Sequence, residues 1–279
     1  MVNLSKFLVE IAGTAVMSIF YLTVGDSQAG MLLGFWVITL FGVSVSGSHF
    51  NPAVTLAIML RRNSNFGSRR ILGILYIVAQ MLGGILGALA CLFLVSSSFG
   101  NPSINVSPMI AKDGTNKGFA VIISELVGTF MFVFIFMLCT DKKTQFSTDK
   151  VVNCFIMSSA YVSARLMSGG TLVTIRQTAE GNVKYIGPLL NPALSFGQML
   201  ISLQFKWIAH YFFIPFGGTV LALIFYEFVF VKSQEYLNAD EEEEEEEGSS
   251  LKDGIDASPP SKKKLIINKE IEEDEDTSA

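Results

Sequence analysis

The sequence contains few of the residues from which enzymes build nucleophilic and metal sites. It has two histidines and three cysteines among 279 residues, and only 16% of its residues are charged while 50% are hydrophobic. The cysteines, Cys91, Cys139 and Cys154, lie in or beside apolar stretches without a Cys-x-x-Cys spacing, which argues against a disulfide framework or a zinc site. We therefore expect a membrane protein without catalytic activity, metal, cofactor or nucleic acid partner.

Charge is scarce in most of the chain and concentrated at its end. Residues 232–279 hold 17 of the 25 acidic residues and 6 of the 20 basic ones, a net charge of −11, which leaves residues 1–231 with a net charge of +6. A segment with seven consecutive glutamates, Glu241–Glu247, cannot bury enough apolar area to offset the entropy of ordering. We expect 232–279 to be a disordered acidic tail. It either binds a cytoplasmic partner or is a solvated segment with no partner.

Six apolar runs in residues 1–231 are long enough to cross a hydrocarbon core of about 30 Å, which takes roughly 20 helical residues. They are Leu4–Val24, Gly30–Ser46, Ile71–Val95, Gly118–Leu138, Val151–Met167 and Trp207–Val231. Two further apolar runs, Ala53–Leu60 and Ala193–Leu203, are too short to span. Residues 1–231 are therefore predicted to form a domain with six transmembrane helices.

Basic residues in the short loops predict the orientation of these helices. With the N-terminus inside, eight basic loop residues face the cytoplasm and five face outward, as the positive-inside rule favours. Both termini are then cytoplasmic, in the plasma membrane or an intracellular vesicle membrane. This orientation places the acceptor pattern Asn105-Val106-Ser107 outside, where Asn105 is either glycosylated or a match by chance.

The chain contains an internal repeat. Val9–Thr14 in the first span resembles Ser124–Thr129 in the fourth, and each is followed by the tripeptide Asn-Pro-Ala. The separation from glutamate to asparagine is 41 residues in the first copy and 66 in the second. The copies cover about 4–95 and 118–231, and because each has three spans, they must be inverted relative to one another in the membrane.

The two tripeptides predict short helices that begin inside the membrane. They are Asn51-Pro52-Ala53 and Asn191-Pro192-Ala193. Asparagine is a preferred N-cap and proline suits the first helical position, so each tripeptide should open a half-helix. Inversion brings the two N-termini together, and each carries about +0.5 elementary charge. Cations are repelled at such a point, whereas water or a small neutral solute can bond to the asparagine amides.

These features resemble the aquaporin, or major intrinsic protein, family over about residues 4–231. The similar segments are Ser46–Thr55, Tyr76–Gly83, Pro215–Gly218 and Leu223–Phe228. The resemblance implies an all-α membrane protein with six transmembrane helices and two re-entrant half-helices in an inverted repeat. It also implies a homotetramer with one pore per subunit for water or, in some members, glycerol.

Two carboxylates, Glu10 and Glu125, lie within predicted spans, where charged groups are costly and usually functional. A proton relay is one interpretation. Their repeat-related positions, and what the resemblance implies, favour structural glutamates that accept hydrogen bonds from the re-entrant loops.

The outer selectivity filter departs from the family pattern. Leu194 follows the second tripeptide where the family normally has arginine, and Arg165 stands where relatives often have a filter histidine. Arg165 either replaces the missing charge from the opposite wall or extends outward to the membrane surface. The third filter residue is Met31, or Phe35 if the alignment shifts.

The resemblance leaves three functions open. Ser195 and the pair Tyr211-Phe212 favour a water channel, because glycerol-carrying relatives differ at these positions. Leu194 favours a broader facilitator of glycerol, urea or ammonia. A non-conducting member with an adhesion or scaffold role is the third interpretation.

Two loops are candidates for regulation. Ser64 follows Arg61-Arg62 and is either a phosphorylation site or a chance match in a basic loop. The additional segment Thr171–Pro188 of the second copy either caps the pore or is a tolerated surface insertion.

Overall fold

The computed structural model describes most of the chain in two units, Met1–Val229 and Phe230–Ala279. The described residues are 2–24, 27–62, 66–99, 104–106, 118–167, 174–177, 183–186 and 188–238. Of the second unit, only residues 230–238 are described, and they are helical. Ser64 and the acidic tail from residue 239 onward lie outside the described residues, so the predictions for them stay predictions.

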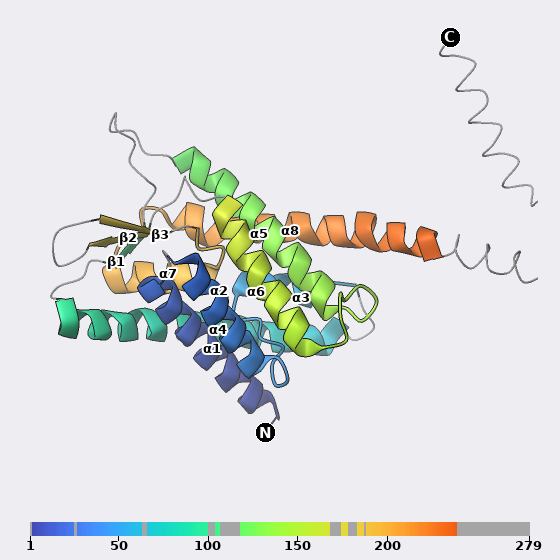
Figure 1. Cartoon of the computed structure of the whole chain (residues 1–279), viewed down its shortest axis with the longest axis horizontal. Coiled ribbons are helices and arrows are strands. Elements are labelled where there is room, and N and C mark those ends of the chain that lie inside the picture. The colour runs from blue at the N-terminus through green and yellow to red at the C-terminus, as the bar shows by residue number, and fades with distance from the viewer. Residues whose placement is uncertain are drawn as a thin grey trace, which may run out of the picture. The chain divides into compact units, whose positions relative to one another are not determined.

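Helices coincide with all six predicted spans (Figure 1). They are α1 (Val2–Val24), α2 (Gln28–Gly42), α4 (Phe66–Phe99), α5 (Gly118–Thr140), α6 (Lys150–Met167) and a last helix built from η1 (Ala209–Phe213), α8 (Ile214–Phe225) and η2 (Tyr226–Phe230). Both predicted half-helices are present as α3 (Pro52–Leu60) and α7 (Pro192–Ser202). The predicted all-α membrane fold with two half-helices is therefore confirmed.

The second and fifth spans differ from the others in length or polarity. Helix α2 has only 15 residues and ends at Gly42, because residues 43–46 form turns that lead into the first tripeptide. Helix α6 carries buried polar side chains at Asn153, Ser158 and Arg165. The remaining four spans are each long and apolar enough to cross a membrane by themselves.

A small antiparallel sheet was not predicted. Strand β1 (Ile104–Val106) pairs with β2 (Thr174–Gln177), which pairs in turn with β3 (Val183–Ile186). Strands β2 and β3 lie within the additional segment Thr171–Pro188, so this segment is tied by backbone hydrogen bonds to the connection between α4 and α5. Asn105 lies opposite Ile175 in this sheet, although its side chain is outside the described residues.

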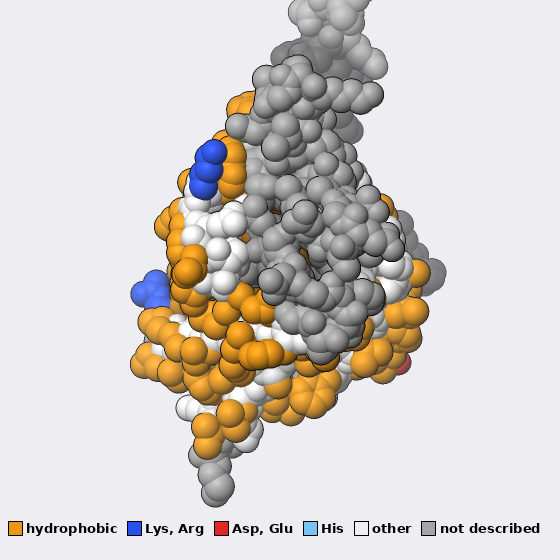
Figure 2. Space-filling view, turned by 90° about the vertical axis from the view of Figure 1, so that its left-hand side faces the viewer, with side chains coloured by type: hydrophobic (Ala, Val, Ile, Leu, Met, Phe, Trp, Pro, Cys, Tyr) orange, Lys and Arg blue, Asp and Glu red, His pale blue; other side chains and the backbone are white. Residues whose placement is uncertain are grey.

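The helix surface is apolar where it faces outward. Large hydrophobic side chains are exposed on every long helix, including Leu8, Phe41, Leu82, Phe119 and Val220. Figure 2 shows hydrophobic side chains over the described part of one face, with the visible Lys and Arg side chains at its edge. Polar side chains such as Glu10 and Gln80 are instead fully buried. This distribution is the one expected when the surrounding solvent is lipid.

Glycines allow close crossings between helices, as is common in membranes. A Cβ added to Gly84 in α4 would overlap the carbonyl of Ala193 in α7, and one added to Gly197 in α7 would overlap the carbonyl of Gly84. Helix α7 is therefore held against α4 by direct backbone contact, which positions the second tripeptide.

We predict that Gly84→Ala lowers the free energy of unfolding by about 1–3 kcal/mol, the usual cost of overpacking a core. The matched control is Gly217→Ala in α8, where the added Cβ would meet only the side-chain Cδ1 of Leu126 at 3.1 Å. Both substitutions replace a helical glycine by alanine and gain the same helix propensity. The difference between their thermal unfolding midpoints in detergent therefore measures the effect of the overlap between α4 and α7. Equal midpoints would contradict the proposed role of Gly84.

Candidate functional site

Each half-helix begins at an asparagine with the geometry of an N-cap. The backbone of Asn51 is extended (φ −155°, ψ 121°) and its Oδ1 accepts a hydrogen bond from the Ala53 N–H at 2.9 Å. Asn191 has the same arrangement (φ −148°, ψ 105°), with a 3.0 Å bond from the Ala193 N–H. Pro52 and Pro192 occupy the first helical positions. The sequence pattern thus forms two equivalent helix starts.

The two helix starts are joined by reciprocal hydrogen bonds. Nδ2 of Asn51 donates to the Leu190 carbonyl at 2.8 Å, and Nδ2 of Asn191 donates to the Phe50 carbonyl at 2.9 Å. Nδ2 of Asn191 also lies 3.6 Å from the Met17 sulfur. The structure therefore brings Asn51 and Asn191 together from segments 140 residues apart.

The loops before the two asparagines adopt strained backbone conformations. Ser48, Phe50 and Leu190 have positive φ values of 53°, 46° and 51°, which are uncommon for residues with a side chain. Such conformations persist only where surrounding contacts enforce them.

Glu10 and Glu125 supply those contacts in equivalent ways. The Glu10 carboxylate accepts from the N–H groups of His49 at 3.1 Å and Phe50 at 2.8 Å. The Glu125 carboxylate accepts from those of Leu189 at 3.0 Å and Leu190 at 2.9 Å. Each glutamate thus binds the two N–H groups immediately before its asparagine.

The first glutamate also joins a side-chain network that the sequence did not predict. Gln80 in α4 donates from Nε2 to Glu10 at 2.7 Å and to Thr55 Oγ1 at 2.7 Å. Nδ1 of His49 lies 3.2 Å from Thr55 Oγ1. This network fixes the first loop to α1, α3 and α4. In the sequence, the only sign of the network is the polar residue Gln80 within an apolar span.

Arg165 is directed into the protein. Its side chain is 2% exposed, and its Nε donates to the Pro188 carbonyl at 3.0 Å. Its guanidinium carbon lies 4.9 Å above the Tyr21 ring and 5.8 Å from the Tyr161 ring centre. The alternative in which Arg165 extends outward to the membrane surface is therefore wrong for this structure, because carbonyl and aromatic partners are available inside.

The other predicted filter residues are also buried. Met31 in α2 and Leu194 in the first turn of α7 each have 0% exposure. The sequence analysis did not assign Tyr21 or Tyr161. Tyr161 precedes Arg165 by four residues, a spacing that places both on one helix face and could have indicated their contact.

A polar clamp lies where α3 and α5 end and α8 meets η2. Arg61, the C-cap of α3, lies with Nη1 3.8 Å from Asp141 Oδ2, and the Tyr226 hydroxyl donates to the same oxygen at 2.7 Å. Burial alone would raise the pKa of Asp141, but hydrogen bonds from the Lys143 N–H and Tyr226, together with the charge of Arg61, hold this pKa below its ordinary value.

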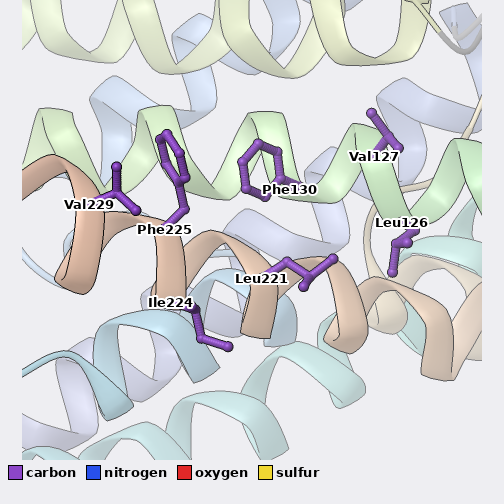
Figure 3. Close-up of a pocket in the computed structure, with 7 residues that line it drawn as sticks. All are labelled: Leu126, Val127, Phe130, Leu221, Ile224, Phe225 and Val229. Atoms are coloured by element: carbon purple, nitrogen blue, oxygen red, sulfur yellow. The ribbon is translucent and has the colours of Figure 1, made fainter. Parts of the chain in front are cut away.

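An apolar groove in the described part of the chain has no features of a polar site. It has a volume of about 500 Å³ and lies between α5 and α8 (Figure 3). Its lining residues are Leu126, Val127, Phe130, Leu221, Ile224, Phe225 and Val229. Their side chains offer no hydrogen-bond partner to a polar solute, so the groove is not the candidate site.

The clamp predicts a pH dependence of stability. A carboxyl whose pKa is lowered by folding stabilises the protein at neutral pH, and this contribution is lost as pH falls through its native pKa. We expect the loss to be smaller and to end at a higher pH in Tyr226→Phe, which at neutral pH is less stable by about 1.5 kcal/mol, and to be absent in Asp141→Asn. Thermal unfolding midpoints between pH 3 and 7 measure this. Parallel curves for all three proteins would contradict it.

Comparison with known proteins gives consistent matches. A sequence profile of the family described as Major intrinsic protein matches residues 22–226. Mouse Aquaporin-4 is 33% identical over 202 residues, covering 71% of this chain and 54% of the relative. Bovine Aquaporin-1 is 28% identical over 190 residues, covering 66% of this chain and 59% of the relative. The chain thus matches little more than half the length of these relatives.

A solved structure supports the fold. The X-ray structure of the aquaglyceroporin from Plasmodium falciparum superposes with a TM-score of 0.54 and covers 82% of this chain and 94% of that one. At 19% identity, this likeness concerns the fold alone.

Proposed function

Because the chain belongs to the major intrinsic protein family, whose members are passive channels and not enzymes, we propose that it conducts water across a membrane down an osmotic gradient. The observation that carries this proposal is the meeting of Asn51 and Asn191 at two opposed helix starts. Each amide nitrogen carries two hydrogens. Among the described contacts of Asn51, one N–H bonds to Leu190, which leaves the other for a solute.

The electrostatics of this meeting point favour a neutral solute. Two helix N-termini each contribute roughly +0.5 elementary charge, which repels hydrated cations and protons. The carboxylates Glu10 and Glu125 are bound to loop N–H groups, and we propose that they are structural and not part of a proton relay. Pro52, Ala53, Pro192 and Ala193 then shape the narrow wall beside the amides.

We also propose that Arg165, Met31 and Leu194 form the outer filter. The contact of Arg165 with the Pro188 carbonyl places its charge beside the loop that leads to Asn191, which supports this assignment. Met31 and Leu194 are apolar, so the guanidinium would supply the filter's charge and donor groups. A broader facilitator of glycerol, urea or ammonia is the alternative that Leu194 supports, and a non-conducting scaffold is an outcome of the experiment below.

The remaining proposals concern assembly, location and modification, and the tetramer is what the family resemblance implies. We propose a homotetramer with cytoplasmic termini, in which 1–231 form the channel domain and 232–279 the cytoplasmic tail. The membrane is the plasma membrane or that of a vesicle. Asn105, on the outer side in this topology, and Ser64, on the inner side, are proposed for glycosylation and phosphorylation.

The channel proposal predicts that purified protein in vesicles accelerates osmotic swelling and that Asn51→Ala and Asn191→Ala each reduce water flux by about fivefold or more. Each substitution removes the helix cap and a hydrogen bond between the loops. Loss of one such hydrogen bond costs about 1 kcal/mol, and a barrier higher by that amount lowers the flux roughly fivefold. Parallel water and glycerol gradients separate a water channel from a broader facilitator. The matched control is Asn3→Ala, an exposed asparagine in α1.

Two results would overturn the channel proposal. Swelling no faster than that of empty vesicles would leave the scaffold role. Proton current comparable to water flux in a planar bilayer would contradict the exclusion of charge by the paired helix starts.

The filter proposal predicts that Arg165→Ala raises permeability to larger or cationic solutes, because a buried charge and a donor are lost together. Leu194→Arg should reduce water flux by crowding the same mouth. Arg165→Lys is the control, since it keeps the charge but lacks the planar guanidinium that bonds to Pro188. If Arg165→Ala leaves glycerol and cation permeability unchanged, Arg165 is not a filter residue.

A further inference from the structure

Three aromatic side chains from three helices form a closely packed group at the centre of the first unit. Phe35 of α2 stacks on Tyr161 of α6 with ring centres 4.6 Å apart and planes 15° apart. Phe132 of α5 meets Tyr161 edge-on at 5.2 Å and Phe35 at 6.2 Å. The exposed fractions are 3% for Phe35 and 0% for the other two. We call these three residues the aromatic cluster.

The cluster lies directly against the loop that opens α7. The Tyr161 hydroxyl donates to the Leu189 carbonyl at 2.9 Å, two residues before Asn191. Phe132 follows Glu125 by seven residues, or two helical turns, so it lies on the same face of α5 as the carboxylate that binds this loop. Contact with the loop therefore comes from both α5 and α6.

Aromatic contacts continue from the cluster to the other loop. Phe132 meets Phe136 at 6.1 Å, and Phe136 meets His49, in the loop that opens α3, at 5.9 Å. A row of rings thus extends from the Leu189 carbonyl to His49, between the two loops that carry the asparagines. The row therefore contacts the loop that leads to Asn191 at one end and the loop that leads to Asn51 at the other.

Three backbone carbonyls near this row are bound to other protein atoms. Within the described residues, the carbonyls of Pro188, Leu189 and Leu190 accept from Arg165, Tyr161 and Asn51. Asn51 and Asn191 are themselves 0% exposed, so a molecule the size of water does not touch them in this conformation. In this conformation the asparagine pair is therefore out of reach of solvent.

We propose that Phe35, Phe132 and Tyr161 form a constriction beside the asparagine pair, which sets the largest solute that can pass and must move for conduction. This inference rests on the proposed channel function. Displacement of the Phe35 ring opens space between α2 and α6. Movement of the Tyr161 hydroxyl frees the Leu189 carbonyl, which then accepts a hydrogen bond from the solute. Because the phenyl rings have no polar atoms, they exclude hydrated ions and favour the smallest neutral molecules.

The test compares water and glycerol permeability of vesicles that contain equal amounts of full-length protein. The variants are Phe35→Leu, Phe35→Leu/Phe132→Leu and Tyr161→Phe. The matched control is Phe41→Leu, also in α2, whose side chain is 58% exposed and lies outside the row. Circular dichroism and size-exclusion chromatography show whether each variant is folded.

We expect water permeability to rise about tenfold in Phe35→Leu and glycerol to pass in the double variant, while Phe41→Leu matches wild type. A tenfold rise corresponds to a barrier lower by about 1.4 kcal/mol. Tyr161→Phe should raise water flux less, because it frees the Leu189 carbonyl but keeps the ring. If the double variant is unfolded, Phe35→Leu and Tyr161→Phe, which remove less volume, still decide the question.

The outcomes separate this inference from the channel proposal. If wild type conducts and the folded variants match it for both solutes, the aromatic cluster is only packing and the constriction is wrong, although the channel function stands. If neither wild type nor any folded variant exceeds empty vesicles, the channel proposal fails. If the variants conduct more than wild type, and Asn191→Ala removes the gain, both proposals hold.

Discussion

The structure depends on satisfying backbone hydrogen-bonding groups in two loops that end inside a membrane. The hydrocarbon core offers no water to replace a missing partner, so irregular backbone is stable only where protein groups bind it or where it lines a water-filled cavity. Glu10 and Glu125 each bind two N–H groups, and Asn51 and Asn191 bind the carbonyls of the opposite loop. Removing any of these side chains leaves buried polar groups without partners, at about 1–3 kcal/mol for each group.

The same bonds determine what the site can recognise. Because the carboxylates bind the N–H groups of the loops, the carbonyls of Phe50 and Leu190 accept from the amides of Asn191 and Asn51. In the proposed channel, the second N–H of Asn51 is the donor for a neutral solute, while two helix starts oppose positive charge. The hydrogen bonds that stabilise the two loops are therefore also the ones that determine the proposed preference for a neutral solute.

The half-helices could be predicted because their signal is local and occurs twice. Asn-Pro-Ala caps a helix by its own chemistry, and the repeated glutamates pointed to an equivalent partner in each half. The aromatic cluster could not be predicted, since Phe35, Phe132 and Tyr161 come from three helices and each fits an apolar span equally well. The sheet was missed because its strands have only three or four residues and β1 pairs with β2 across 70 residues of sequence. The sequence also left the direction of the Arg165 side chain open, because that direction depends on Tyr21 and Pro188, which are near it in space but distant in sequence.

The two halves of the repeat hold the loops before their asparagines in the same way, but they differ at the position seven residues after each glutamate. Met17 and Phe132 both follow their glutamates by seven residues, so they occupy matching positions. Met17 is a flexible thioether whose sulfur lies 3.6 Å from Asn191, whereas Phe132 is a rigid ring packed between two others. A methionine can change rotamer at little cost, while a ring moves only if its neighbours move with it. Resistance to a passing solute should therefore come mainly from the second half of the repeat, where α5 and α6 meet α2, although the loops of both halves are held in the same way.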